Sequence, residues 1–273
     1  MRRVLFEIAG YPVSSFWAMA FLGFIVAFFV LRAGLRRRGY DERVAYDITL
    51  WAYVGGWVGA RLFVIPTGWE YFVESPILFL LSGSGWVWYG GVIGGAVAVW
   101  MWARRHGLPI LAIGDITAPA LAIGLGIGRI GCQLAGDGDY GVPSDLPWAM
   151  AYPDGVVPTL DRVHPTPVYE MIGCFAIAAY LLRMAPTGRP IGHQLGLYLG
   201  LSALLRFAIE FVRRNPAWLF GLTTAQWMSI GSVALGWYLV RTAREAWPGP
   251  ESFNAAVAAP ADADEREPAE PFF

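Results

Sequence analysis

Arg129 is the residue whose type and position point most clearly to chemistry. It lies at the end of a long apolar run, inside the string GRIGCQLAGDGDYG at 128–141. A guanidinium keeps its proton at every relevant pH, so placing one at membrane depth is costly unless an anion or a polar cavity receives it. Arg61 and Arg206 also fall within or at the edge of apolar segments. The anion expected in that setting is a phospholipid headgroup, so these arginines predict a phosphate-binding site.

Acidic residues accompany the arginines. Arg206 and Glu210, in the string RFAIEFVRR at 206–214, are four residues apart and share one face of a helix. Taken alone, this pair fits an internal ion pair as well as a site. Glu170 follows His164 closely, at the start of another apolar segment. Unlike charges gathered at one membrane depth favour a functional site over a set of independent pairs.

The composition describes an integral membrane protein. Hydrophobic residues make up 56% of the 273 residues, charged residues 15%, and the mean hydropathy is +0.47. A net charge of −1 argues against nucleic acid as a partner. Every residue of the Lys+Arg total is arginine, which leaves no lysine for Schiff-base chemistry. Cys132 and Cys174 lack the paired spacing of a zinc site, so we expect two free thiols, no metal and no cofactor.

The elements that must position these residues are helices. Apolar stretches predict an all-α membrane protein with about seven transmembrane helices, and a short apolar run at 76–81 could be re-entrant or interfacial. The seven segments are 16–31, 44–65, 85–103, 113–130, 168–182, 195–212 and 224–240. Arginines cluster after the first, third, fifth and seventh segments. By the positive-inside rule those loops are cytoplasmic, which places the N-terminus outside and the C-terminus inside.

This topology defines one domain and a tail. Residues 1–247 form the polytopic domain, and 131–167 form its only sizeable extramembrane segment, a small head on the outer side. The aspartates in that segment fit simple solvation, since a surface loop is polar in any case. The tail at 248–273 is rich in Ala, Pro, Asp and Glu without apolar periodicity, so we expect it to be disordered and cytoplasmic.

Glycines recur on the predicted helices. Gly126, Gly128 and Gly131 spell G-x-G-x-x-G, but no strand precedes them, so a dinucleotide site is disfavoured. Close helix packing through small residues explains them better. The same interpretation covers the glycines of the second and third segments, namely Gly55, Gly56, Gly59, Gly90, Gly91, Gly94 and Gly95.

Four strings together resemble the bacterial prolipoprotein diacylglyceryl transferase family. They are GRIGCQLAGDGDYG, DLPWAMAYP at 145–153, HPTPVYE at 164–170 and RFAIEFVRR, and the resemblance covers about 14–241. It implies a multi-pass enzyme of the bacterial inner membrane with its N-terminus in the periplasm. Such an enzyme moves the diacylglyceryl group of phosphatidylglycerol to the lipobox cysteine of a prolipoprotein, and glycerol phosphate leaves. The implied partners are phosphatidylglycerol, prolipoprotein signal peptides and membrane lipid.

The resemblance also implies roles. Arg129 matches the family's signature arginine and Arg206 its second arginine, and both would bind the phosphate as its negative charge grows. Glu170 and Glu210 would orient these guanidiniums or hold headgroup hydroxyls. Asp137 stands where the family has glutamate, and we place it with the substrate-binding residues.

The chain departs from the family pattern at other positions. Tyr89 replaces the histidine to which the thiol base is usually assigned, Cys132 replaces an asparagine, and Phe16 replaces a tyrosine. A tyrosine with a pKa of about 10 is a weak base at neutral pH without a cationic neighbour. His164 is the other candidate base, although a histidine before proline is often structural.

Two functional classes follow. One is an active transferase in which Arg129 and Arg206 bind phosphate while Tyr89 or His164 handles the proton. The other is a non-catalytic or altered-specificity relative that binds anionic phospholipid as an accessory membrane protein. An ion-coupled transporter is disfavoured because the two halves of the chain share no internal repeat.

Overall fold

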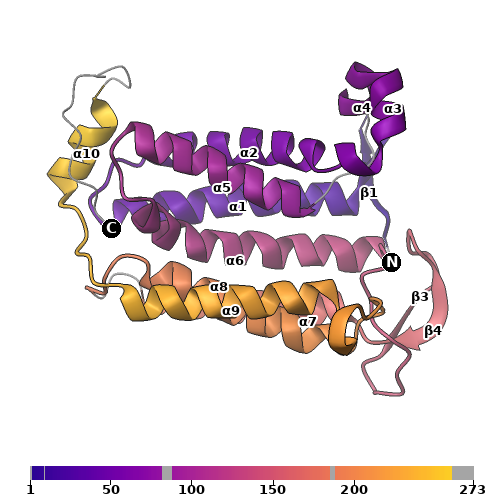
Figure 1. The fold of residues 1–273 in the computed structure, drawn as a ribbon. Helices are drawn as coiled ribbons and strands as arrows, with labels where there is room; N and C mark the ends of the chain where they lie inside the picture. The colour runs from indigo at the N-terminus through magenta and orange to yellow at the C-terminus, as the bar shows by residue number, and fades with distance from the viewer. Residues whose placement is uncertain (1, 9, 82–87, 185–187, 260–273) are drawn as a thin grey trace. The chain divides into compact units, whose positions relative to one another are not determined.

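Helices make up most of the chain in the computed structural model, which describes residues 2–8, 10–81, 88–184 and 188–259 (Figure 1). All seven apolar segments form helices, although 85–87 of the third lie outside the described residues. These helices are α1 (Ser15–Arg36), α2 (Val44–Leu62), α5 (Trp88–Arg105), α6 (Ile110–Ala135), α7 (Thr166–Met184), α8 (His193–Glu210) and α9 (Thr224–Thr242). Short helices follow α2: η1 (Ile65–Thr67), α3 (Trp69–Glu74) and α4 (Pro76–Leu81). A further turn, η2 (Leu219–Gly221), precedes α9.

Three of the described helices are long and apolar enough to cross a membrane, namely α1, α6 and α7. They carry mean hydropathies of 2.2, 1.9 and 1.3 over an 18-residue stretch. The count of seven spans stays a prediction.

The expectation of an all-α fold was incomplete, because two small antiparallel sheets are present. Strand β1 (Val4–Ile8) pairs with β2 (Tyr11–Ser14), directly before α1. Strand β3 (Met150–Tyr152) pairs with β4 (Thr159–Val163), inside the segment predicted as the head. Three to five residues are too few to produce a recognisable alternation in the sequence, so the search for long apolar runs missed these strands.

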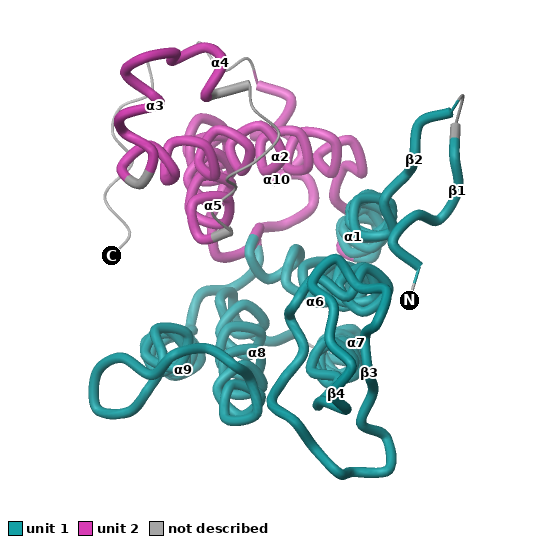
Figure 2. The backbone as a smooth tube through the Cα atoms, turned by 90° about the vertical axis from the view of Figure 1, so that its right-hand side faces the viewer, with its two compact units in different colours: residues 1–37, 114–247 teal, residues 38–113, 248–273 magenta. Residues whose placement is uncertain are grey.

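The single domain predicted for 1–247 divides into two compact units (Figure 2). Unit 1 comprises Met1–Arg37 with Gly114–Trp247, and unit 2 comprises Arg38–Ile113 with Pro248–Phe273. Each unit thus combines segments far apart in the sequence, which apolar runs along the chain do not reveal.

In unit 1, α6 packs against its neighbours through small residues. Ala118 and Ala122 of α6 share a buried cluster with Ala178 and Leu181 of α7. At Gly23 of α1 a Cβ atom would lie 2.9 Å from a backbone oxygen of α6, so only glycine permits this approach.

The close packing predicted for the α6 glycines is confirmed at Gly126 and Gly131, where a Cβ atom would lie 2.8 Å from the Phe175 ring and 3.2 Å from the Cα of Phe16. It is wrong for Gly128, where a Cβ atom would meet nothing within 4 Å.

Buried Asp115, near the start of α6, fixes α8. Its carboxylate accepts hydrogen bonds from the backbone N–H groups of Gly192 (2.8 Å) and Leu195 (2.6 Å) at the N-terminus of α8. A carboxylate at this end also complements the helix dipole. This aspartate therefore sets the position of the helix that carries Arg206 and Glu210.

In unit 2, α2 and α5 pack as an antiparallel pair through glycines. A Cβ atom at Gly59 would lie 2.8 Å from the Cα of Gly94, and one at Gly94 would lie 2.7 Å from the Cα of Gly59. The two backbones are therefore in direct contact, as predicted for these glycines.

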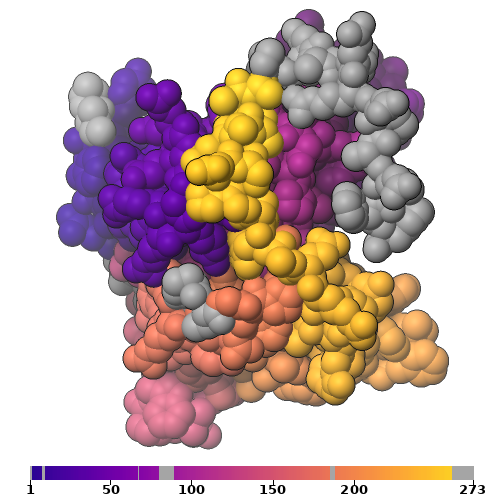
Figure 3. All heavy atoms as spheres, turned by 90° about the vertical axis from the view of Figure 1, so that its left-hand side faces the viewer, coloured from indigo at the N-terminus to yellow at the C-terminus, as the bar shows by residue number. Residues whose placement is uncertain are grey.

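The tail differs from the expectation of disorder at 248–273. Pro250–Ala258 form a helix, α10, which lies on the surface against the purple start of unit 2 (Figure 3). Phe253 is buried and stacks on Tyr40 at a ring distance of 3.9 Å, and the Tyr40 hydroxyl donates to the Pro248 carbonyl at 2.8 Å. This docking stabilises a helix too short to show apolar periodicity. The rest of the predicted tail, 260–273, lies outside the described residues.

Candidate functional site

The site begins where α6 ends. Ala135 is the last residue of the helix, and Gly136 follows with φ +60°. Gly138, with φ +94°, turns the chain again between Asp137 and Asp139. These backbone conformations are strained for residues with a Cβ atom, so the glycines of the GDGD string are required to place two carboxylates beside the end of α6.

Three arginines and three carboxylates form one ion-pair network. Arg129 contacts both Asp139 and Glu170. Arg206 binds Glu170 at 2.7 Å and Glu210 at 2.8 Å. The network confirms that these distant strings converge, and it places Arg129, Arg206, Glu170 and Glu210 together.

Arg213 completes the network. Its guanidinium lies 2.5 Å from Asp139, 3.4 Å from Glu170 and 3.8 Å from Glu210. It comes from the turn after α8, where Gly141 and Arg213 form an isolated β-bridge. Asp139 and Arg213 were not singled out from the sequence, because this bridge joins segments more than 70 residues apart. The available signals were the strings GRIGCQLAGDGDYG and RFAIEFVRR, which contain Asp139 and Arg213.

Glu210 is held from the opposite side as well. It is 3% exposed, and its Oε1 accepts from Thr223 Oγ1 at 2.8 Å and from Asn215 Nδ2 at 2.7 Å. Thr223 also caps α9 in a reciprocal pair with Gln226. A buried carboxylate with this many donors has a fixed orientation, so it fixes Arg206 in turn.

Asp139 is the most strongly ionised carboxyl of the turn. Burial would raise its pKa, but the Arg129 and Arg213 guanidiniums outweigh burial and hold the pKa below its usual value. Asp137 behaves in the opposite way. Burial and the neighbouring Asp139 charge raise its pKa above the usual value for aspartate.

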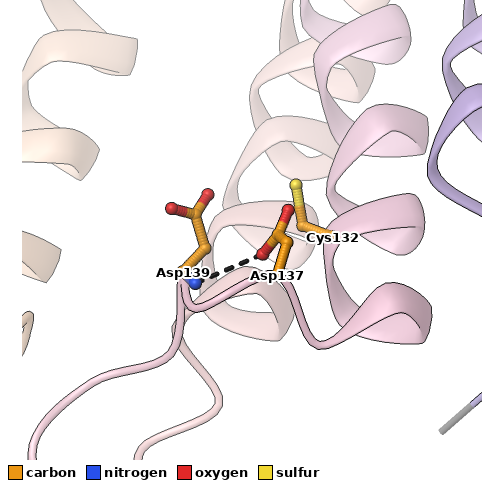
Figure 4. A group of neighbouring side chains, drawn as sticks. All are labelled: Cys132, Asp137 and Asp139. Carbon is orange, nitrogen blue, oxygen red and sulfur yellow. Dashed lines mark hydrogen bonds between the residues drawn. The ribbon is translucent and has the colours of Figure 1, made fainter. Parts of the chain in front are cut away.

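Cys132, Asp137 and Asp139 lie together, with their ligand atoms within 4.8 Å of one another (Figure 4). Such a set could be considered for a metal ion, but Arg129 contacts Asp139 and also lies 3.6 Å from Cys132 Sγ. Arg213 engages the other oxygen of Asp139. Because two guanidiniums already engage both oxygens of Asp139, a metal ion would be a third cation at this position, which its charge pattern disfavours. Both cysteines are free thiols, as predicted.

The two candidate bases belong to different units. Nδ1 of His164 lies 3.2 Å from the Tyr169 hydroxyl, which accepts from Trp148 Nε1 at 2.8 Å. These contacts link the His164 ring to Tyr169 and Trp148 and favour a structural role for the histidine. Tyr89 lies in the first turn of α5 in unit 2 and is 36% exposed, and its part in the site stays a prediction.

The network provides convergent guanidiniums that are held in place before any ligand arrives. Fixed donors of this kind stabilise a phosphate or another oxyanion without reorganising. The fold and site therefore define a class, a helical membrane protein with a prearranged arginine and carboxylate cluster.

The comparisons identify the family within that class. The family model for prolipoprotein diacylglyceryl transferase matches residues 3–242, and the chain belongs to this family of bacterial membrane enzymes. A phosphatidylglycerol–prolipoprotein diacylglyceryl transferase of Clostridium tetani is 31% identical over 238 residues, which cover 86% of this chain and 95% of the relative. The second such transferase of Clostridium perfringens is 32% identical over 233 residues, covering 84% and 91%. That of Nitrobacter winogradskyi is 36% identical over 256 residues, covering 85% of each chain.

Proposed function

We propose that this chain transfers the diacylglyceryl group of phosphatidylglycerol to the lipobox cysteine thiol of prolipoproteins and releases glycerol phosphate. The observation that carries the proposal is the network of Arg129, Arg206 and Arg213 on fixed carboxylates, in a chain that belongs to this family. The thiol sulfur bonds to the glycerol carbon next to the phosphate. The carbon–oxygen bond breaks, and its electron pair leaves with the phosphate.

Arg129 and Arg206 bind the phosphate of the donor lipid. Negative charge grows on the phosphate oxygen as the bond breaks, so donors fixed beforehand lower the barrier. Glu170 and Glu210 hold the guanidiniums in orientation, because each forms an ion pair with Arg206, at 2.7 Å and 2.8 Å. Arg213 supports the same geometry through Asp139.

We place the protein in the bacterial inner membrane, with its N-terminus in the periplasm and its C-terminus in the cytoplasm. Arginines in alternate loops support this orientation. The network would then lie on the periplasmic side, where the turn after α6, the start of α7 and the end of α8 meet. A fluorescent protein fused after Phe273 should fluoresce in cells, because it would fold in the cytoplasm. A fusion without fluorescence would indicate that the fluorescent protein had been exported unfolded to the periplasm, which would contradict this orientation.

The function is tested with the purified full chain in phosphatidylglycerol vesicles and a peptide that carries a lipobox cysteine. We expect a peptide mass increased by one diacylglyceryl group, blocked by prior alkylation of the thiol, and glycerol phosphate in equal amount. A chain that binds phosphatidylglycerol vesicles but yields no thioether would instead be an accessory lipid-binding relative.

A further inference from the structure

Asp137 is a carboxylate that lies beside the ion-pair network without being part of it. Three guanidiniums, of Arg129, Arg206 and Arg213, are matched by three carboxylates, of Asp139, Glu170 and Glu210. Asp137 lies beside this network, and within the described residues it forms no ion pair with any of the three arginines. Proton uptake by Asp137 therefore costs the network none of its ion pairs.

The surroundings of Asp137 favour a proton. Asp137 Oδ1 accepts from the backbone N–H of Asp139 at 3.2 Å (Figure 4). The charged and titratable groups facing it are Arg129 and Cys132 from α6, Asp139 from the same turn, and Tyr152 from β3. Three of these neighbours favour the ionised form, namely Cys132, the Asp139 N–H and the Arg129 charge. Burial and the Asp139 charge outweigh them and raise the pKa of Asp137 above the usual value.

A thiol already lies beside Asp137. Sγ of Cys132 is within 4.8 Å of a carboxylate oxygen of Asp137 (Figure 4). Asp139 offers no comparable position, because Arg129 engages one of its oxygens and Arg213 the other. Of the two aspartates in the turn, Asp137 is the one whose carboxylate is paired with none of the three arginines and whose pKa is raised.

We propose that Asp137 accepts the proton of the acceptor thiol, in place of the substrate-binding role expected from the resemblance, an inference that rests on the proposed function. As the sulfur bonds to the glycerol carbon, the S–H proton moves to a carboxylate oxygen of Asp137. The carbon–oxygen bond breaks, and the phosphate leaves with the bonding pair on the Arg129 side. The network is neutral before the step, and Asp137 becomes neutral while the leaving phosphate takes up the charge. A later exchange with water returns the proton.

The test compares Asp137→Asn, which keeps shape and removes the base, with Asp137→Glu, which restores a carboxylate. Asp154→Asn serves as the matched control, because Asp154 is an exposed aspartate of the same segment. Vesicle transfer is measured as kcat and KM from pH 4 to 9, phosphatidylglycerol binding as Kd, and folding as the midpoint of thermal unfolding. We expect Asp137→Asn to lower kcat about 100-fold or more with Kd and unfolding unchanged.

The pH dependence separates a base from a structural role. A protonated Asp137 cannot accept, so wild-type transfer should fall as pH drops through the raised pKa of Asp137. Asp137→Asn should lose this acidic limb, and Asp137→Glu should recover it. A normal kcat in Asp137→Asn overturns the inference. So does a fall of kcat in this variant that is accompanied by weaker phosphatidylglycerol binding and a lower unfolding midpoint. The transferase proposal stands in both cases. A wild-type chain without transfer overturns both.

Discussion

At the scale of residues, the site is a set of charges that orient one another. Arg129, Arg206, Glu170 and Glu210 could be predicted to converge, because costly charges at the ends of apolar segments need partners. Their pairing could not be predicted. Asp139 and Arg213 were missed, since the bond between them spans 74 residues and depends on the bridge at Gly141. His164 was considered as a base, yet its neighbour at hydrogen-bonding distance is Tyr169.

Asp139→Asn should disrupt the network by leaving Arg129 and Arg213 with one anionic oxygen fewer each. The expected result is at least about a tenfold loss of phosphatidylglycerol binding, because both guanidiniums lose their orientation. The measurement is vesicle binding, with exposed Asp145→Asn as the control. Equal binding by the two variants would show that Asp139 does not orient the arginines.

The same carboxyl sets a pH limit. The folded-state pKa of Asp139 lies below its unfolded value, so its stabilising contribution is complete above about pH 4. That contribution is lost as pH falls through the lower, folded-state value. In Asp139→Asn, the fall in thermal stability below about pH 4 should be smaller than in the wild-type chain.

At the scale of elements, the helices were predictable and the small sheets were not. All seven apolar segments became helices, because long apolar runs carry a clear signal. Glycines on α2 and α5 also fulfilled their predicted role as close contacts. The strands β3 and β4 carry no such signal. Their pairing is determined by tertiary contacts that a local pattern does not record.

Gly59→Ala should destabilise the pair of α2 and α5. Its Cβ atom would meet the α5 backbone, and forced separation of packed helices costs about 1–3 kcal/mol. Gly91→Ala is the matched control, since its Cβ atom would lie 3.5 Å from the nearest backbone oxygen, an ordinary contact. Thermal unfolding in detergent should show a lower midpoint for Gly59→Ala only. Equal midpoints would mean that the contact is not close in solution.

At the scale of the whole molecule, the chain folds as two units that each combine distant segments. Membrane class and family were predictable from composition and from four strings. The division into units was not, because it depends on which helices pack together. The α10 helix was not predicted either, since its stability comes from Tyr40, a residue 213 positions before Phe253.

Phe253→Ala should release α10 from unit 2. Removing a fully buried phenylalanine costs about 3–5 kcal/mol, more than a nine-residue helix can recover by itself. In limited proteolysis of the full chain, the segment that follows Pro248 should then be cleaved faster in Phe253→Ala than in Glu251→Ala, a control at an exposed residue of the same helix. Unchanged cleavage would show that Phe253 does not anchor the helix.

Arg129→Lys tests most directly whether a prearranged guanidinium binds the donor phosphate. Lysine keeps the charge but cannot reproduce the planar fork that contacts both Asp139 and Glu170 and that we propose to bind the phosphate. In the vesicle transfer assay, with exposed Arg244→Lys as the control, we predict at least about a 100-fold loss of thioether formation for Arg129→Lys alone. Transfer by Arg129→Lys at the rate of the control would contradict the account.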